Sequence, residues 1–421
     1  MSKYILKDNG PLQGEIEING AKNSVLGLIA ASILCDDVIE LKNVPNVSDV
    51  KNLLEGLKSL GSKIDFNTKT HILSIDNRNI NPDIMLDFDF IRKIRASYYL
   101  LGALLGKYHK AIVSLPGGCN IGTRPMDLHF KGFEALGANL LLDNGNIIAT
   151  TNKLVGTKIY LDFASVGATI NILLASVLAK GTTILFNAAK EPHVVDIINF
   201  LNAMGANITI FEDKIVIQGV KKLHTTSYKV MFDQIEAGTF LLASAITKGN
   251  ITIEKINAKD MECITLKLQE MGCKINNYND AINIDCNFKD FYLKPTNIIT
   301  NPYPGFPTDM QPQFAITLGL ANGLSVINET IFENRYIYTD EISRMGGKMI
   351  VHGNTNIITG VSNYIGARVV SPDLRAGAAL TLAGLTTKNN TIIENIHLIK
   401  RGYENFDEKL RLLGANIQEI A

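Results

Sequence analysis

The hydrophobic positions of the chain form two kinds of helical pattern that alternate along its length. One kind is amphipathic: residues 50–60 place valine and leucine at helical spacing and leave the opposite face polar. The other kind is apolar nearly all round, and a helix without a polar face must be buried. This second kind occurs over residues 24–34, 96–105, 168–178, 238–246, 313–320 and 376–385.

Each amphipathic helix ends at a glycine that is followed by a β-rich run. A glycine in this place is typical of a helix C-cap, where the chain turns left-handed. The signature recurs about every 70 residues, which indicates an internal repeat. Its glycines are Gly61, Gly137, Gly205, Gly272, Gly346 and Gly414.

The repeat predicts an α/β fold built from β-α-β-α-β-β units, with the apolar helices inside and the sheets packed around them. The sixth copy stops after one short strand, so we expect the N-terminal strands 4–6 and 15–18 to complete it. Three units then form one domain over residues 22–230. Residues 1–21 plus 231–421 form a second domain, with a hinge near residues 21 and 231 and a substrate cleft between the domains.

Composition narrows the function classes. Of the 421 residues, 46% are hydrophobic and 19% charged, and the 41 basic and 41 acidic side chains balance, which weighs against nucleic-acid binding. The five cysteines form no CxxC pair and suit a reducing cytoplasm. The seven histidines lack ligand spacing. We therefore expect a cytoplasmic, monomeric protein with no metal, no cofactor, no signal peptide and no membrane helix.

Polar residues gather in the loops that enter the buried helices and in the loops before the amphipathic helices. Any one basic residue there is typical of a solvated surface, but six at corresponding loops of a repeat predict a convergent anion site. These six are Lys22, Arg95, Arg124, Arg335, Arg375 and Arg401.

Three aspartates also stand ahead of buried helices. We interpret Asp233 and Asp373 as helix caps. Asp309 lies in the turn Phe306-Pro307-Thr308-Asp309 and is either a cap or a base that takes a proton from a substrate hydroxyl.

One glycine- and proline-rich loop, residues 114–125, carries Cys119 five positions before Arg124. A thiol beside a fixed positive charge loses its proton more readily, so Cys119 is a candidate reactive group. The residues alone leave open an ordinary turn whose cysteine faces a small core.

Motifs along the whole chain resemble those of the enolpyruvyl transferases. The matching segments are 19–24, 95–97, 114–125, 165–169, 187–192, 235–239, 306–311, 332–335, 373–376 and 401–404. The resemblance implies two inside-out α/β domains of three units each. It also implies transfer of an enolpyruvyl group from phosphoenolpyruvate to the 3-hydroxyl of UDP-N-acetylglucosamine, with release of phosphate, at the first committed step of peptidoglycan synthesis.

The resemblance assigns roles residue by residue. Cys119 would be the proton donor and the thiol that fosfomycin-type inhibitors alkylate, and Asp309 would be the base. Lys22, Arg124 and Arg401 would hold phosphoenolpyruvate, with Asn23 and Arg375 nearby. The residues implied for the UDP-sugar site are Arg95, Arg124, Pro125, Met126, Asp127, Leu128, Ser165, Val166, Gly167, Asp309 and Ile331.

The chain departs from some relatives at Phe163 and Ala164, where they carry a lysine, so one predicted contact to the UDP diphosphate is in doubt. Transfer to shikimate 3-phosphate is the nearest alternative function, and the Cys119 loop argues against it. RNA 3′-phosphate cyclisation and a silent repeat scaffold are further alternatives. The first would need a nucleotidylated histidine and a basic groove, and the second gives no reason for basic residues to converge.

Overall fold

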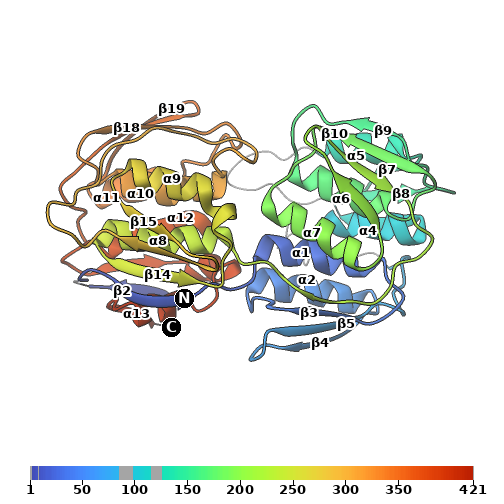
Figure 1. The fold of residues 1–421 in the computed structure, drawn as a ribbon, viewed down its shortest axis with the longest axis horizontal. Coiled ribbons are helices and arrows are strands. Elements are labelled where there is room, and N and C mark those ends of the chain that lie inside the picture. Colours follow the sequence, from blue (N-terminus) through green and yellow to red (C-terminus); the bar gives the residue numbers. More distant parts are fainter. Residues whose placement is uncertain (1, 8, 85–97, 115–125, 421) are drawn as a thin grey trace. The chain divides into compact units, whose positions relative to one another are not determined.

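The computed structural model describes residues 2–7, 9–84, 98–114 and 126–420. Their contacts divide them into two compact units (Figure 1). The N-terminal unit comprises the described residues from 20 to 231, and the C-terminal unit comprises those from 2 to 19 together with 232–420. The predicted domain boundaries, 22–230 against 1–21 plus 231–421, stay a prediction.

The N-terminal unit alternates helices with short strands. Its helices are α1 (Lys22–Ser32), α2 (Ser48–Ser59), α4 (Tyr99–Tyr108), α5 (Asp127–Ala135), α6 (Val166–Ser176) and α7 (Pro192–Ala203). Its strands are β3 (Ile39–Lys42), β4 (Lys63–Asn67), β5 (Ile72–Asp76), β6 (Lys110–Ser114), β7 (Asn139–Asp143), β8 (Asn146–Thr150), β9 (Lys158–Tyr160), β10 (Thr182–Phe186), β11 (Asn207–Ile210), β12 (Lys214–Gln218) and β13 (Ser227–Lys229).

The C-terminal unit has the same alternation. Its helices are α8 (Gln234–Thr247), η2 (Ala258–Met261), α9 (Glu262–Glu270), η3 (Thr308–Met310), α10 (Gln311–Leu318), α11 (Thr339–Arg344), α12 (Leu374–Gly384), η4 (Ile396–Arg401) and α13 (Phe406–Leu412). Its strands are β1 (Lys3–Leu6), β2 (Gln13–Glu17), β14 (Asn250–Glu254), β15 (Lys274–Asn277), β16 (Ala281–Asp285), β17 (Ile298–Ile299), β18 (Leu324–Asn328), β19 (Lys348–His352), β20 (Thr355–Thr359), β21 (Arg368–Val370), β22 (Thr391–Glu394) and β23 (Ile417–Ile420).

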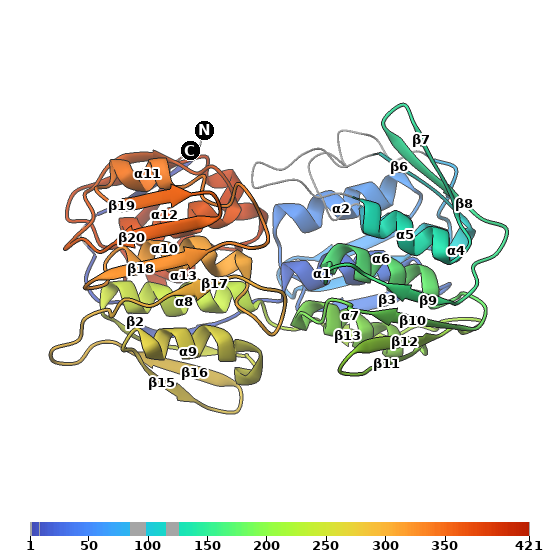
Figure 2. The same cartoon turned by 90° about the horizontal axis from the view of Figure 1, so that it is seen from above.

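The apolar helices lie in the cores of the units, as the sequence predicts. In the C-terminal unit α8, α10 and α12 pack against one another, and in the N-terminal unit α4 packs against α1 and α6 (Figure 2). Every residue of α10 is buried, because the helix has no polar face to turn toward water. The six repeat glycines all have positive φ, between 79° at Gly346 and 107° at Gly61, which confirms their interpretation as left-handed C-caps.

The sheets repeat one pattern. In the third repeat β9 and β10 are parallel across helix α6, and the antiparallel strands β12 and β11 follow beside β10. Alternate residues of β10 face the core, so Thr183 and Leu185 are buried while their neighbours are more exposed. Among the described residues this four-stranded arrangement occurs in five sheets, and a sixth sheet contains only the antiparallel strands β6, β8 and β7.

Only one of the two N-terminal strands completes the sixth repeat, so that expectation was partly wrong. Strand β1 does complete the sixth repeat, because it lies between β22 and β23. Strand β2 does not join it; instead it pairs in parallel with β14 of the fourth repeat, Gln13 opposite Asn250 through Glu17 opposite Glu254. With neighbours on both sides, β1 leaves no edge for β2. The fourth repeat has such an edge because the strand just before α8, β13, pairs instead with β3 of the first repeat.

Candidate active site

Asp309 lies in a short turn that is fixed by aromatic packing. Phe306 is buried, and its ring meets that of Phe314 edge to face at 4.9 Å between centroids, which ties the turn to α10. Neither η3 nor α10 begins with a side-chain cap. Asp309 therefore does not cap a helix, which rules out one of the two roles predicted for it.

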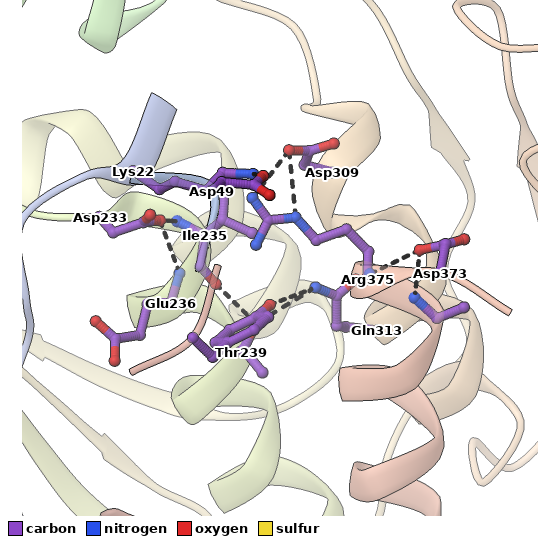
Figure 3. A network of polar contacts seen from close by, with 12 residues as sticks. Lys22, Asp49, Asp233, Ile235, Glu236, Thr239, Asp309, Gln313, Asp373 and Arg375 are labelled. Carbon is purple, nitrogen blue, oxygen red and sulfur yellow. Dashed lines mark hydrogen bonds and ion pairs between the residues drawn. The ribbon is translucent and has the colours of Figure 1, made fainter. Parts of the chain in front are cut away.

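The Asp309 carboxylate instead joins two buried arginines. Oδ1 accepts a hydrogen bond from NH2 of Arg335 at 3.1 Å. Oδ2 accepts from Nε and NH2 of Arg375 at 3.3 and 3.0 Å (Figure 3). The side chains of the two arginines are 2% and 4% exposed, against 28% for that of Asp309. The carboxylate thus links the buried positive charges to the more exposed side of the site.

The two guanidinium groups are only partly satisfied. Nε of Arg335 and NH1 of Arg375 are buried and have no hydrogen-bond partner among the described residues. Burial lowers the pKa of Arg375, but the charge of Asp309, followed by Tyr403 and Asp233, outweighs it and raises that pKa above its ordinary value. Arg375 therefore remains a cation, and a buried donor without a partner favours an anionic ligand.

Aspartate caps position the helices that surround the site. Oδ1 of Asp373 accepts from the backbone N–H of Arg375 and Ala376 at 2.7 and 3.0 Å, so the first turn of α12 holds the arginine in place. Oδ1 of Asp233 accepts from Ile235 N and Glu236 N at 2.9 and 3.0 Å at the start of α8. Both predicted caps are confirmed.

Glu329 orders the neighbouring loop, and no sequence pattern points to this role. Oε1 accepts from the backbone N–H of Ile331 and Phe332 at 2.9 and 3.2 Å, and Oε2 accepts from the Thr308 hydroxyl at 3.0 Å. This buried carboxylate therefore connects Ile331, a predicted UDP-sugar contact, to the residue before Asp309.

In the N-terminal unit the start of α1 is anchored by two buried acids. Lys22 Nζ donates to Oδ2 of Asp49 at 3.3 Å, and both side chains are buried. The Ser24 hydroxyl donates to Asp196 of α7, which also accepts from the hydroxyl of Tyr228 at 2.7 Å. Burial raises the pKa of Asp196 against these hydrogen bonds. The anchored turn holds Lys22 and the adjacent Asn23 in fixed places.

The other predicted residues mostly lie at helix ends. Ser165 caps α6 by accepting from Ala168 N at 3.3 Å, and Val166 and Gly167 begin that helix. Met126, Asp127 and Leu128 stand at the start of α5, and Arg401 ends η4. Cys119, Arg95, Arg124 and Pro125 lie outside the described residues. Within the described ranges no group of three or more His, Cys, Asp and Glu side chains could hold a metal ion, and no helix could cross a membrane.

Comparison with known proteins decides the family. The model for EPSP synthase (3-phosphoshikimate 1-carboxyvinyltransferase) matches residues 6–410. This chain belongs to the EPSP synthase family of enolpyruvyl transferases. The resemblance seen in the sequence motifs is thereby confirmed.

Relatives within the family match the chain end to end. A protein from Clostridium botulinum named UDP-N-acetylglucosamine 1-carboxyvinyltransferase is 47% identical, with 100% of both chains covered. UDP-N-acetylglucosamine 1-carboxyvinyltransferase 3 from Caldanaerobacter subterraneus subsp. tengcongensis is 46% identical at the same coverage.

Solved structures confirm the two-domain α/β fold. The enolpyruvyl transferase NikO from Streptomyces tendae has a TM-score of 0.90 at 23% identity, covering 100% of this chain and 99% of its own. EPSP synthase from Acinetobacter baumannii has a TM-score of 0.78 at 20% identity, with both chains fully covered.

Proposed function

We propose that this enzyme transfers the enolpyruvyl group of phosphoenolpyruvate to the 3-hydroxyl of UDP-N-acetylglucosamine and releases phosphate. The observation that carries the proposal is the full-length identity of 46–47% to two relatives that bear the corresponding name. The solved structures are less than 25% identical to this chain and support only its fold. The choice of UDP-N-acetylglucosamine as the acceptor therefore rests on these two relatives. The reaction supplies a precursor for peptidoglycan synthesis.

Asp309 is the proposed base on the sugar hydroxyl. Two buried cations favour its carboxylate form and fix its orientation, but they also weaken it as a base. Substrate binding resolves this conflict if an anionic group of phosphoenolpyruvate engages Arg375. The charge of Arg375 is then shared with the substrate, and Asp309 becomes a better proton acceptor once both substrates are bound.

The buried donors support the placement of phosphoenolpyruvate. NH1 of Arg375 and Nε of Arg335 have no partner among the described residues, and an unsatisfied buried donor costs about 1–3 kcal/mol. An anionic ligand would satisfy such donors. Lys22, Arg124 and Arg401 are proposed to hold the remaining charges, and Arg95, Ser165 and Ile331 to contact the UDP-sugar with the neighbours named above.

Cys119 is the proposed acid that protonates the enol methylene. Cys119→Ala should abolish turnover, because no group then supplies that proton. Cys119→Asp should retain activity, since a carboxylic acid can donate a proton, yet resist inactivation by thiol-alkylating epoxides. Normal phosphate release by the alanine variant would exclude the donor role.

The deciding assay measures inorganic phosphate released from phosphoenolpyruvate with each of two acceptors. We expect release with UDP-N-acetylglucosamine and none with shikimate 3-phosphate or without an acceptor. The Asp309→Asn variant is the matched control for phosphate that arises without catalysis. Release with shikimate 3-phosphate, and not with the UDP-sugar, would refute the proposal.

A further inference from the structure

A layer of buried polar side chains lies beside Arg375, and the roles proposed above do not use it. It consists of Thr239 on α8 and Gln313 on α10, both labelled in Figure 3, together with Tyr403 just after η4. Thr239 and Gln313 are fully buried and Tyr403 is 1% exposed. Polar groups placed so deep cost free energy unless they are hydrogen-bonded, so their arrangement needs a physical reason.

The donors and acceptors in this layer can be assigned from the contacts. The Thr239 hydroxyl donates to the backbone oxygen of Ile235 at 2.7 Å, so its single proton is already committed. At the 2.9 Å contact between the two hydroxyls, Thr239 must therefore accept and Tyr403 must donate. Gln313 Nε2 can only donate, so the Tyr403 oxygen accepts from it at 3.2 Å. The phenol is fixed in one orientation.

The fixed phenol lies against the arginine that binds Asp309. The ring centroid of Tyr403 is 5.4 Å from the guanidinium carbon of Arg375, within the range of a cation–π contact. Burial raises the pKa of Tyr403, although the charge of Arg375 lowers it, so the hydroxyl stays protonated at neutral pH. Tyr403 therefore acts on Arg375 as a neutral, oriented dipole and not as a counterion.

We infer that Tyr403 is a positioning residue for Arg375. With α8 and α10 supplying its hydrogen-bond partners, the phenol holds the guanidinium in the orientation that presents Nε and NH2 to Asp309. This orientation is the one in which Arg375 is proposed to meet phosphoenolpyruvate, so the functional part of the inference rests on the proposed function. The alternative is a tyrosine whose hydroxyl is merely satisfied inside the core.

Tyr403→Phe tests the inference because it keeps the ring, which packs 4.9 Å from that of Phe406 between centroids, and removes the hydroxyl. We expect the KM for phosphoenolpyruvate to rise about tenfold, with kcat and the KM for UDP-N-acetylglucosamine within about threefold of wild type. An unchanged KM for phosphoenolpyruvate, whatever happens to kcat, would overturn the inference.

Tyr364→Phe is the matched control. Tyr364 is also buried in the C-terminal unit, and its hydroxyl donates to the Ile316 oxygen at 2.7 Å. We expect this variant to lose stability and keep the wild-type KM. An equal rise in KM would mean that any lost core hydrogen bond has the same effect, which contradicts the inference. If Tyr403→Phe does not fold, Thr239→Val removes the acceptor of the phenolic proton and should raise the same KM.

A measurement without turnover separates this inference from the proposed reaction. The Nε–H resonance of Arg375 in a ¹⁵N NMR spectrum should exchange slowly with water in the wild type and in Tyr364→Phe. In Tyr403→Phe it should exchange at least tenfold faster, because the guanidinium is no longer held against Asp309. Unchanged exchange would overturn the positioning role even if the reaction is as proposed. A wild type without phosphate release would refute only the reaction.

Discussion

Replacing Asp309 tests at once whether it is the base and whether it neutralises the buried arginines. Asp309→Asn keeps the size of the side chain but removes its charge and its ability to take up a proton. The amide still offers one oxygen, whereas its NH2 group would face a guanidinium donor that it cannot satisfy. The variant should therefore lose both catalysis and stability, and it should do so for two separable reasons.

The size of the stability loss follows from burial. Breaking a buried ion pair by removing one partner costs about 3–5 kcal/mol. Arg335 and Arg375 are almost fully buried, but the Asp309 side chain is 28% exposed, and solvent screening reduces the effect. We therefore expect a loss of about 3 kcal/mol. For a unit of this size, that corresponds to a fall of about 6–12 °C in the thermal midpoint of the C-terminal unit.

Catalysis and binding should respond in opposite directions. Loss of the base should lower kcat by about 10²–10⁴-fold. Binding of phosphoenolpyruvate should stay as tight as in the wild type or become tighter, because Arg335 and Arg375 lose the anion that competes for them. Phosphate release measures the first effect, titration calorimetry the second, and scanning calorimetry the change in stability.

Glu394→Gln is the control for loss of a carboxylate in the same unit. Its partner Arg368 is mostly exposed, so the ion pair at 2.5 Å should contribute nothing measurable to the thermal midpoint. Wild-type turnover by Asp309→Asn would refute the base assignment. An unchanged thermal midpoint would refute the reasoning about the buried arginines, and weaker binding of phosphoenolpyruvate would refute the competition between anions.

Three further predictions concern stability. Burial lowers the pKa of His129 to about 4, below its value near 6.5 in the unfolded chain, so the free energy of unfolding should fall by about 3 kcal/mol as the pH drops from 6.5 to 4. In His129→Gln, whose side chain can still accept from Asn171, the free energy of unfolding measured with urea should depend less on pH over this range. Gly360→Ala would place a Cβ 1.7 Å from a backbone oxygen and should lower the thermal midpoint strongly, whereas Gly10→Ala, with open space around it, should not. Asp373→Ala should lower the free energy of unfolding, measured with urea, by about 1 kcal/mol, because helix α12 loses its N-cap.

The repeat made most of the fold predictable. Apolar helices and glycine caps are local patterns, and the structure places them within a few residues of the predicted ranges. Strand pairing is not local. The sequence predicts that strands 4–6 and 15–18 both complete the sixth repeat. The partner of β2 is instead β14, more than two hundred residues away, and no pattern near residue 15 specifies it. The pairing of β13 with β3 could not be predicted either, because these strands also lie far apart in the sequence.

The residue types of the candidate site could be predicted from the sequence, but the contacts between those residues were harder to predict. The placement of arginines at corresponding loops pointed to Arg335 and Arg375, yet the carboxylate that joins them is 26 and 66 residues away from them. Gln313 did carry a signal, since a glutamine inside an apolar helix must find buried partners. The anion-binding role of Lys22 stays a prediction, and Asp49, its partner on the next helix, was missed.

A departure from the repeat explains why Asp309 differs from the other two aspartates. Asp233, Asp309 and Asp373 each precede an inner helix of the C-terminal unit. Asp233 and Asp373 stand at the N-cap, where one carboxylate oxygen of each accepts hydrogen bonds from backbone N–H groups. Before α10 the chain forms the extra turn η3, with Asp309 inside it, so this carboxylate is moved off the N-cap and its two oxygens reach two different arginines. The short turn η3 thus places Asp309 where it meets two cations of the site instead of capping the helix.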